Sequence, residues 1–242
     1  MTEPLSRRSR IRADTAREIT QTARLVVTDQ GVDGLTLRAV AREMGLTAPA
    51  LYRYFASRED LVEHVVADLY AELCDELDAA RDSARPATPG VQLMAVSRRF
   101  RTWAHTHRAE FGLLFGSPAE SLGAHGAGEG PAGAAARRFG ETLGALVAQI
   151  YLQRGFPILA DEQLDPAYQE QLRSWRDTLP VTLPIGVMHV FLSCWIRLYG
   201  TVCMEAFGHL RFAVADAEPV FEAELRALGE VLGVAADYRP PP

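Results

Sequence analysis

The chain has 242 residues, 48% of them hydrophobic, so it can bury a substantial core as one helical body or two small domains. It begins MTEPLSRRSR with no apolar run behind this stretch, which argues against a signal peptide and favours the cytoplasm. The cysteines, Cys74, Cys194 and Cys203, lack metal-ligand or redox-motif spacing. We therefore predict buried thiols with no metal and no cofactor, and thiol-based redox sensing remains an alternative.

The net charge of −6 is unevenly distributed along the chain. Residues 1–60 contain 10 Arg against 8 acidic residues, a net +2, which leaves −8 for the remainder. Arg7, Arg8, Arg10 and Arg12 precede this weakly basic head. The electric field of a polyanion such as DNA would attract the basic residues 1–60 and repel the acidic remainder, and so orient the molecule. The arginines are either an arm that reaches such a partner or a solvated, disordered tail.

The first predicted helix runs from about Ala13 to Gln30 and ends at Gly31. A second begins after Thr36, a good N-cap, and places Leu37, Val40, Ala41 and Met44 on one apolar face. Gly45 ends it, at a position that usually needs a positive φ.

A third, short helix of about two turns follows, with Thr47 as cap and Pro49 in its first turn. Leu51 and Phe55 point inward, which leaves polar and aromatic side chains outside. Soluble helices seldom expose two tyrosines and an arginine together unless something binds there. Two helices joined by a tight turn fit a helix-turn-helix that presents its second helix to the DNA major groove.

A fourth helix is predicted from Ser57, in a capping-box-like start with Asp60, to about Arg81. Its inward stripe is Leu61, Val65, Leu69, Leu73 and Leu77. The loop 83–90 is the natural boundary to a second domain.

Beyond this loop we predict helices over 91–107, 110–115 and 135–154. Residues 117–134 contain almost no large apolar side chain and are expected to lack a fixed shape. Residues 155–184 should be irregular, with a short helix over 168–177.

Two long helices, 185–209 and 218–232, close the chain. Arg197 and Glu205 are the only formally charged residues of the first, so it must be covered nearly all round. A membrane span is disfavoured because the uncharged run before Arg197 is shorter than the ~20 residues a span needs. On the second helix Val220, Phe221, Leu225, Leu228 and Leu232 should face inward. The two helices have too much apolar surface for one body, which predicts a homodimer through a four-helix interface.

The N-terminal residues resemble the DNA-binding domain of the TetR family of transcriptional regulators. The residues that carry the resemblance are Gly31, Gly34-Leu35-Thr36, Ala41, Gly45, Leu51-Tyr52, Tyr54-Phe55 and Ser57 to Leu61. The C-terminal half is similar to a TetR subgroup named for a Trp, then Leu-His-Gly, motif on the long dimer helix. Here the motif reads Trp195, then Leu198-Tyr199-Gly200, so any role of the missing imidazole does not transfer.

This resemblance implies an all-α fold: an N-terminal three-helix helix-turn-helix domain (1–60), a connecting helix (61–82) and a helical-bundle domain for ligand binding and dimerisation (90–235). The expected DNA contacts are Thr36, Arg38, Thr47, Ala48, Pro49, Ala50, Tyr52, Arg53, Tyr54 and Arg58. Hydroxyls and Arg58 suit phosphates, whereas Arg53 or Arg38 could read guanine and the alanines and proline could read thymine methyls or shape.

Apolar and aromatic residues of the second domain are candidates for a small-molecule site. They are Trp103, Phe111, Phe115, Leu146, Ile150, Met188, His189, Phe191, Trp195 and Tyr199. The alternative for each is ordinary bundle core.

No acid, base or nucleophile lies at catalytic spacing, so an enzyme is not expected. The leading hypothesis is a ligand-responsive repressor that binds a palindromic DNA operator as a homodimer and is released by a small apolar or aromatic effector. A DNA-binding module without an effector is the alternative. A helical enzyme or lipid carrier is disfavoured by the basic arm and the outward tyrosines.

Overall fold

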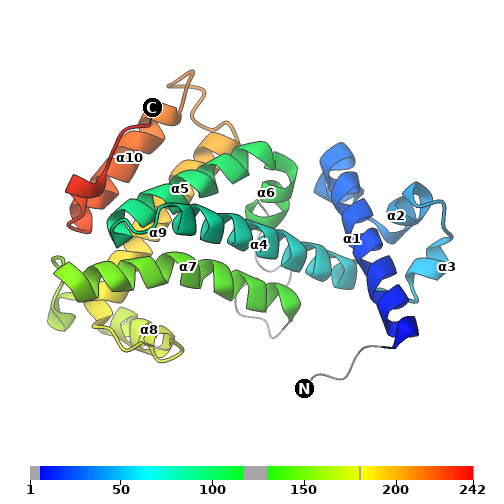
Figure 1. The fold of residues 1–242 in the computed structure, drawn as a ribbon, viewed down its shortest axis with the longest axis horizontal. Coiled ribbons are helices and arrows are strands. Elements are labelled where there is room, and N and C mark those ends of the chain that lie inside the picture. Colours follow the sequence, from blue (N-terminus) through cyan, green and yellow to red (C-terminus); the bar gives the residue numbers. More distant parts are fainter. Residues whose placement is uncertain (1–5, 117–129, 180, 242) are drawn as a thin grey trace. The chain divides into compact units, whose positions relative to one another are not determined.

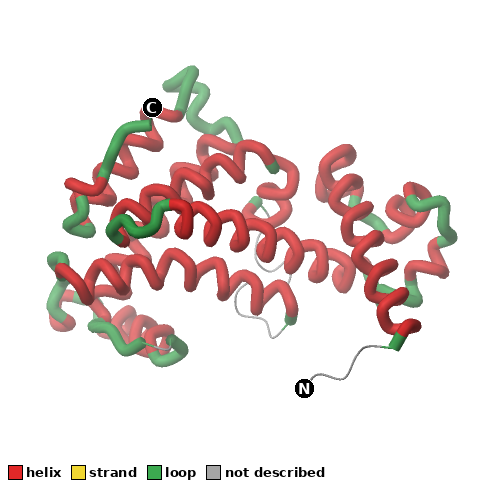
Figure 2. The backbone as a smooth tube through the Cα atoms, in the orientation of Figure 1, coloured by secondary structure: helices red, strands yellow, loops and turns green. Residues whose placement is uncertain are grey.

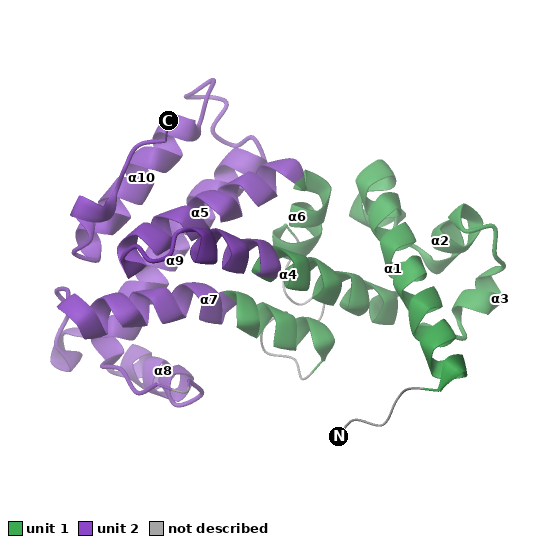
Figure 3. Ribbon diagram, in the orientation of Figure 1, with its two compact units in different colours: residues 1–74, 107–139 green, residues 75–106, 140–242 purple. Residues whose placement is uncertain are grey.

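The computed structural model describes residues 6–116, 130–179 and 181–241. Figure 2 shows helices joined by loops, and no strand occurs within these ranges. The predicted all-α fold is therefore confirmed. Two compact units, coloured in Figure 3, comprise Met1–Cys74 with His107–Phe139 and Asp75–Thr106 with Gly140–Pro242. This grouping by contacts differs from the functional division suggested by the sequence, which stays a prediction.

Helix α1 spans Arg7–Gly34 and begins earlier than the predicted Ala13 (Figure 1). The reason lies at its N-terminus, where the Ser6 hydroxyl accepts a hydrogen bond of 3.1 Å from the Ser9 backbone N–H and caps the first turn. Residues 7–12, expected as an arm or a tail, are therefore helical.

Two glycines mark the ends predicted for the first two helices, and both have a positive φ, which was predicted for Gly45 only. Gly31 has a φ of 75° and interrupts α1 where the first helix was expected to end. Gly45 has a φ of 66° and makes the turn after α2, Leu37–Glu43. Thr36 caps α2 as predicted, since its side chain accepts a 3.1 Å hydrogen bond from the Ala39 N–H.

Helix α3 spans only Ala48–Leu51, shorter than the two turns predicted. Tighter turns follow, in which the N–H groups of Arg53 and Tyr54 bond to carbonyls three residues back, at 3.4 and 2.8 Å. Thr47 occupies the predicted N-cap position, but its side chain makes no capping hydrogen bond. Pro49 has no N–H to offer, and the Ala50 N–H bonds to the Thr47 backbone carbonyl at 2.9 Å instead.

Helix α4 spans Arg58–Ser83, and its predicted cap is confirmed. The Ser57 hydroxyl accepts from the Asp60 N–H at 3.2 Å, and the Asp60 carboxylate accepts from the Ala56 N–H at 2.7 Å. The predicted inward stripe is fully buried, at 0% exposure for each residue: Leu61, Val65, Leu69, Leu73 and Leu77.

The first unit also contains α6, Arg108–Phe115, and the start of α7, Pro131–Arg154. Residues 117–129 of the segment expected to lack a fixed shape lie outside the described residues. Its last residues, Pro131 to Ala134, form the first turn of α7, which corrects that expectation. Proline at the first helical position followed by alanines favours a helix.

The second unit contains α5, Pro89–Thr106, the short helices η2, Asp161–Gln163, and η3, Ala235–Asp237, and α8, Pro166–Arg176. Helix α8 lies close to its predicted place. It begins at Pro166 because the Asp165 carboxylate caps it, accepting from the N–H groups of Ala167 and Tyr168 at 2.9 and 3.1 Å.

The two C-terminal helices are α9, Ile185–Ala206, and α10, Glu218–Val231. Helix α9 ends before the predicted His209 because Gly208 takes a φ of 74°. Figure 1 shows α5, α9 and α10 beside one another. Helix α9 alone among the described helices is long and apolar enough to cross a membrane, a test that core helices of soluble proteins also pass.

The first turn of α9, residues 185–188, is buried on all sides, whereas the rest of the helix is buried along one side. Ile196 and Met204 remain 60% and 42% exposed, so the all-round cover predicted for this helix is not supplied within one chain. On α10 the predicted stripe is buried except for Val220, which is 37% exposed. Val220 is wrongly placed because it precedes Phe221 by one residue, which is about 100° around a helix.

Candidate nucleic-acid interface and effector site

The short helix α3 is held by two inward anchors. Leu51 is 0% exposed and Phe55 is 2% exposed. With these side chains in the core, the rest of the segment faces outward, and Tyr52 is 57% exposed. Thr47, Pro49 and Arg53 are also exposed, whereas Ala48, Ala50 and Tyr54 are half-buried. These exposed residues, Thr47, Pro49, Tyr52 and Arg53, form the polar flank of α3.

Helix α2 adds an exposed rim to this surface. Thr36 and Arg38 are both exposed, at the start of the helix. The Thr36 oxygen accepts from Ala39, which leaves the hydroxyl proton free to be donated to an oxygen such as that of a phosphate.

Arg58 is placed differently from the other predicted contacts. Its Nε donates to the Leu35 carbonyl at 2.6 Å, and its Nη2 donates to the Val32 carbonyl at 3.2 Å. The guanidinium therefore ties α4 to the turn after α1. A phosphate contact by Arg58 stays a prediction and has to compete with these bonds.

Arg12, grouped in the sequence only with the basic N-terminal residues, contacts the segment that follows α3. Its Nη2 donates to the Arg53 carbonyl at 3.0 Å, and its guanidinium carbon lies 5.6 Å from the centre of the Tyr54 ring. The contact joins residues 41 positions apart, and no local pattern could have predicted it.

A buried ionic group supports the same unit. Arg24 of α1 donates to both carboxylate oxygens of Glu72, at 2.7 and 3.3 Å, and to Glu110 of α6 at 3.4 Å. Burial by itself would lower the pKa of Arg24, but the two carboxylates outweigh it and the pKa is raised. This group fixes α1 against α4 and α6.

The ten predicted effector residues are distributed over both compact units, and their role stays a prediction. Phe111 and Phe115 belong to the first unit, where their rings lie 4.8 Å apart and Phe115 is 5.8 Å from both Tyr70 and Phe139. The other eight belong to the second unit.

Among these eight, Trp103, Leu146, Ile150 and Met188 are buried in the helical core. The half-buried residues make aromatic and polar contacts along α9. Trp195 stacks on Tyr199 with ring centres 5.4 Å apart, Phe191 lies 5.8 Å from Trp175, and Tyr168 Oη lies 3.2 Å from His189 Nδ1.

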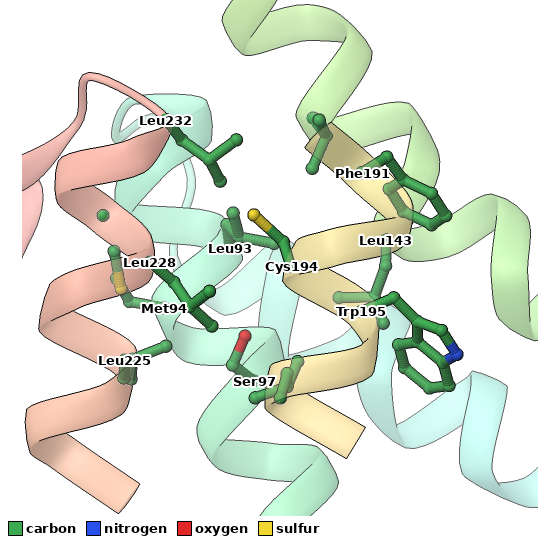
Figure 4. Close-up of a pocket in the computed structure, with 13 residues that line it drawn as sticks. Leu93, Met94, Ser97, Leu143, Phe191, Cys194, Trp195, Leu225, Leu228 and Leu232 are labelled. Carbon is green, nitrogen blue, oxygen red and sulfur yellow. The ribbon is translucent and has the colours of Figure 1, made fainter. Parts of the chain in front are cut away.

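A small apolar hollow lies between α5, α7, α9 and α10 (Figure 4). Its volume is about 30 Å³, room for a water molecule or two and far less than an organic effector fills. Only Phe191 and Trp195 of the predicted set line it. The other lining residues were missed, because core positions carry no sequence mark of a void: Leu93, Met94, Ser97, Leu143, Val147, Cys194, Leu198, Leu225, Leu228, Gly229 and Leu232.

Cys194 projects into the space between α9 and α10 (Figure 4). Burial raises the pKa of its thiol to about 11, with a smaller opposing effect of Arg197. Burial also raises the pKa of the Cys203 thiol. Thiols with raised pKa values carry little thiolate at neutral pH, which disfavours redox sensing.

Charged side chains join α5 to the last two helices. The Arg101 guanidinium donates to both oxygens of Glu205, at 2.8 and 2.7 Å, and His105 Nε2 lies 3.1 Å from the same carboxylate. One turn away, Arg98 makes a similar two-bond contact with Glu222 of α10, at 2.8 and 2.6 Å. These pairs satisfy charges that the bundle would otherwise bury alone.

Among the described residues, no group of three or more His, Cys, Asp or Glu side chains could hold a metal ion. Two exposed features could bind a partner: the polar surface around α3 and the apolar side of α9 that carries Ile196 and Met204.

Comparison with known proteins agrees with this arrangement. Residues 19–65 match a family model described as bacterial regulatory proteins of the tetR family, and residues 93–228 match one described as a tetracyclin repressor-like C-terminal domain. The HTH-type transcriptional regulators Mb1846 of Mycobacterium bovis and Rv1816 of Mycobacterium tuberculosis are each 31% identical over 216 residues, 89% of this chain and 91% of theirs.

Two solved structures share the fold. A protein described as a regulatory protein, SCO4313, is 28% identical with a TM-score of 0.69 over 92% of this chain and 98% of its own. RolR, crystallised with its ligand resorcinol, is 17% identical with a TM-score of 0.59 over 96% of this chain and 97% of its own.

Proposed function

Since this chain belongs to the TetR family of bacterial regulators, we propose that it is a ligand-responsive repressor that binds a palindromic operator as a homodimer. The chain is a transcriptional regulator and not an enzyme. One observation supports the DNA-binding role most directly: the short α3, anchored by Leu51 and Phe55, leaves Thr47, Tyr52 and Arg53 exposed together. We expect it to act in the cytoplasm.

The polar flank around α3 would contact DNA in two ways. Phosphate contacts from hydroxyls position a protein on the duplex, whereas base contacts give specificity. Tyr52, Tyr54 and Thr36 suit the first role. Arg53 or Arg38 could donate to both guanine acceptors, which is worth about 1–3 kcal/mol of discrimination.

Two substitutions separate these roles. Tyr54→Phe should weaken binding similarly for all operator sequences, because the tyrosine hydroxyl would contact only the phosphates of the DNA backbone. Arg53→Ala should relax the preference at one position per half-site. Titration of a panel of base-substituted duplexes measures both, and the reverse pattern would show that the contacts are wrongly assigned.

A homodimer would bring two such surfaces to one duplex. The exposed apolar side of α9, with Ile196 60% and Met204 42% exposed, supports a partner on this helix. The predicted interface uses 185–209 and 218–232, and an apolar side of this kind is typical of surfaces that bind another protein.

The effector would bind inside the second domain and favour one spacing of the two heads over another. The 30 Å³ hollow is too small for an aromatic compound, so binding would require the helices around Phe191 and Trp195 to open. The RolR complex is an example of a similar fold that holds an aromatic molecule.

The small volume of the hollow also favours a second candidate, a DNA-binding regulator without an effector. A mobility shift separates the two, with DNA from upstream of the protein's own gene and an apolar extract of the cells. Release by the extract supports the repressor with an effector, and binding that no extract alters supports the second candidate. Failure to bind any duplex at moderate salt would contradict both.

A further inference from the structure

The C-terminal end of α3 is held by a residue from a distant part of the chain. The helix has only four residues, and backbone hydrogen bonds of the following turns continue the segment to Phe55. Arg53 follows directly, and its carbonyl accepts a 3.0 Å hydrogen bond from Arg12 Nη2 of α1. This bond ties α1 to the turn that follows α3.

The same guanidinium orients the neighbouring ring. The Arg12 guanidinium carbon lies 5.6 Å from the centre of the Tyr54 ring, within the range of a cation–π contact. Tyr54 is half-buried, whereas Tyr52 is 57% exposed.

Arg12 can make these contacts only because α1 extends past its amphipathic part. The Ser6 cap starts the helix at Arg7, so that Arg12 lies in its second turn instead of in an irregular tail. Arg10 lies in the same turns and is also exposed, but among the described residues its side chain makes no hydrogen bond or ion pair.

We propose that Arg12 is a positioning residue for DNA recognition. It fixes the end of α3 and the ring of Tyr54 before DNA arrives, so that Arg53 and Tyr54 meet the duplex in one arrangement. Arg12 therefore acts through these two residues and not by contact with a phosphate. The inference rests on the proposed DNA-binding role of the α3 surface.

The test uses the full chain with the substitutions Arg12→Ala, Arg12→Lys and, as the matched control, Arg10→Ala. The probes are a duplex selected from random sequences by the wild-type protein and an unselected duplex of equal length. Binding is measured over a range of salt concentrations. Loss of a phosphate contact lowers the salt slope by about 0.9, whereas loss of a positioning contact leaves it unchanged.

We expect Arg12→Ala to weaken binding to the selected duplex about tenfold, as loss of a charge-assisted hydrogen bond and a cation–π contact would, with an unchanged salt slope. The preference for the selected over the unselected duplex should fall, while Arg10→Ala leaves that preference intact. Arg12→Lys keeps the charge but not the planar group, so it should restore only part of the affinity. A reduced slope for Arg12→Ala with full rescue by lysine would overturn the proposal.

A double-mutant cycle and one measurement without DNA complete the test. In a Tyr54→Leu background the effect of Arg12→Ala should shrink, because one of its targets is gone. In the free protein, Arg12→Ala should speed hydrogen exchange of the Tyr54 and Phe55 amides relative to Arg10→Ala. Equal exchange in both variants would refute the positioning role, and this measurement needs no DNA. Failure of the selection to recover any duplex would count against the proposed DNA-binding function instead.

Discussion

Arg58 stabilises the turn between α1 and α2. Its guanidinium donates to the carbonyls of Leu35 and Val32 at 2.6 and 3.2 Å, between α4 and the turn after α1. Both bonds are charge-assisted, and a half-buried carbonyl that loses its donor is only partly compensated by water.

We expect Arg58→Ala to lower the free energy of unfolding by about 1–3 kcal/mol, as measured by thermal or urea unfolding. Arg58→Lys should recover less than half of this, because an ammonium group cannot reach two carbonyls in the geometry of a planar fork. If both variants unfold like the wild type but bind DNA more weakly, Arg58 contacts phosphate and its structural role is minor.

At the scale of elements, the turn between α2 and α3 depends on the backbone of Gly45. Its φ is 66°, and an added Cβ would meet no atom within 4 Å. Any cost of a side chain there is therefore conformational and not steric. Gly140 in α7 offers the opposite case, since it is helical and exposed and its Cβ would also meet nothing within 4 Å.

We therefore expect Gly45→Ala to destabilise the protein by about 1–2 kcal/mol, the cost of the left-handed conformation for a residue with a Cβ. Gly140→Ala should stabilise it by up to about 1 kcal/mol, because alanine is the better helix former. Chemical unfolding of both variants measures the change in the free energy of unfolding for each substitution. The same sign of change in both would contradict this assignment.

The pairing of α5 with α9 should make stability depend on pH. Burial alone would raise the pKa of Glu205, but hydrogen bonds from Arg101 and His105 outweigh it and place the pKa below the ordinary 4.5. The carboxylate therefore contributes stability above pH 4.5, and this contribution is lost as the pH falls through the lower folded value.

Glu205→Gln should reduce the free energy of unfolding by about 1–3 kcal/mol at neutral pH, because the half-buried Arg101 loses its two-bond partner and keeps only the 3.5 Å contact with Glu218. The difference from the wild type should shrink as the pH is lowered below about 4.5, because Glu205 is then protonated first in the unfolded chain and, at the lower folded pKa, also in the native protein. Unfolding curves between neutral pH and acid give this difference directly. A difference that stays constant or grows in acid would show that the ion pair is not the cause.

For the whole molecule, the proposed dimer requires an exposed apolar surface on each chain. Ile196 on α9 is 60% exposed, and Leu152 on α7 is 66% exposed, so both are apolar side chains in contact with solvent. Only Ile196 belongs to the interface predicted from the sequence. A charge buried at an interface without a partner is strongly unfavourable.

Ile196→Glu should weaken the dimer at least about 100-fold, whereas Leu152→Glu should leave it intact. Sedimentation equilibrium would then report a mass near the 26.6 kDa of one chain for the first variant alone. The monomer should also bind a palindromic duplex poorly, because each head contacts only one half-site. Dimers that persist in Ile196→Glu would exclude this side of α9 as the interface.

The sequence by itself determined the local elements and their burial. Apolar spacing and capping residues act within a few positions, which is why the α4 stripe, the Thr36 cap and the turn at Gly45 could be predicted. It also determined the family, because the string from Gly31 to Leu61 combines many such signals at fixed spacings.

Only the tertiary structure decided which distant groups meet. The Arg12 contacts with Arg53 and Tyr54 and the carbonyls that bind Arg58 both depend on how the helices pack. Spacing along one helix says which side of it is apolar, but not which neighbour covers that side or how much space remains. For that reason the polar flank of α3 was visible in the sequence, whereas the small volume of the hollow and the hold of α1 on α3 were not.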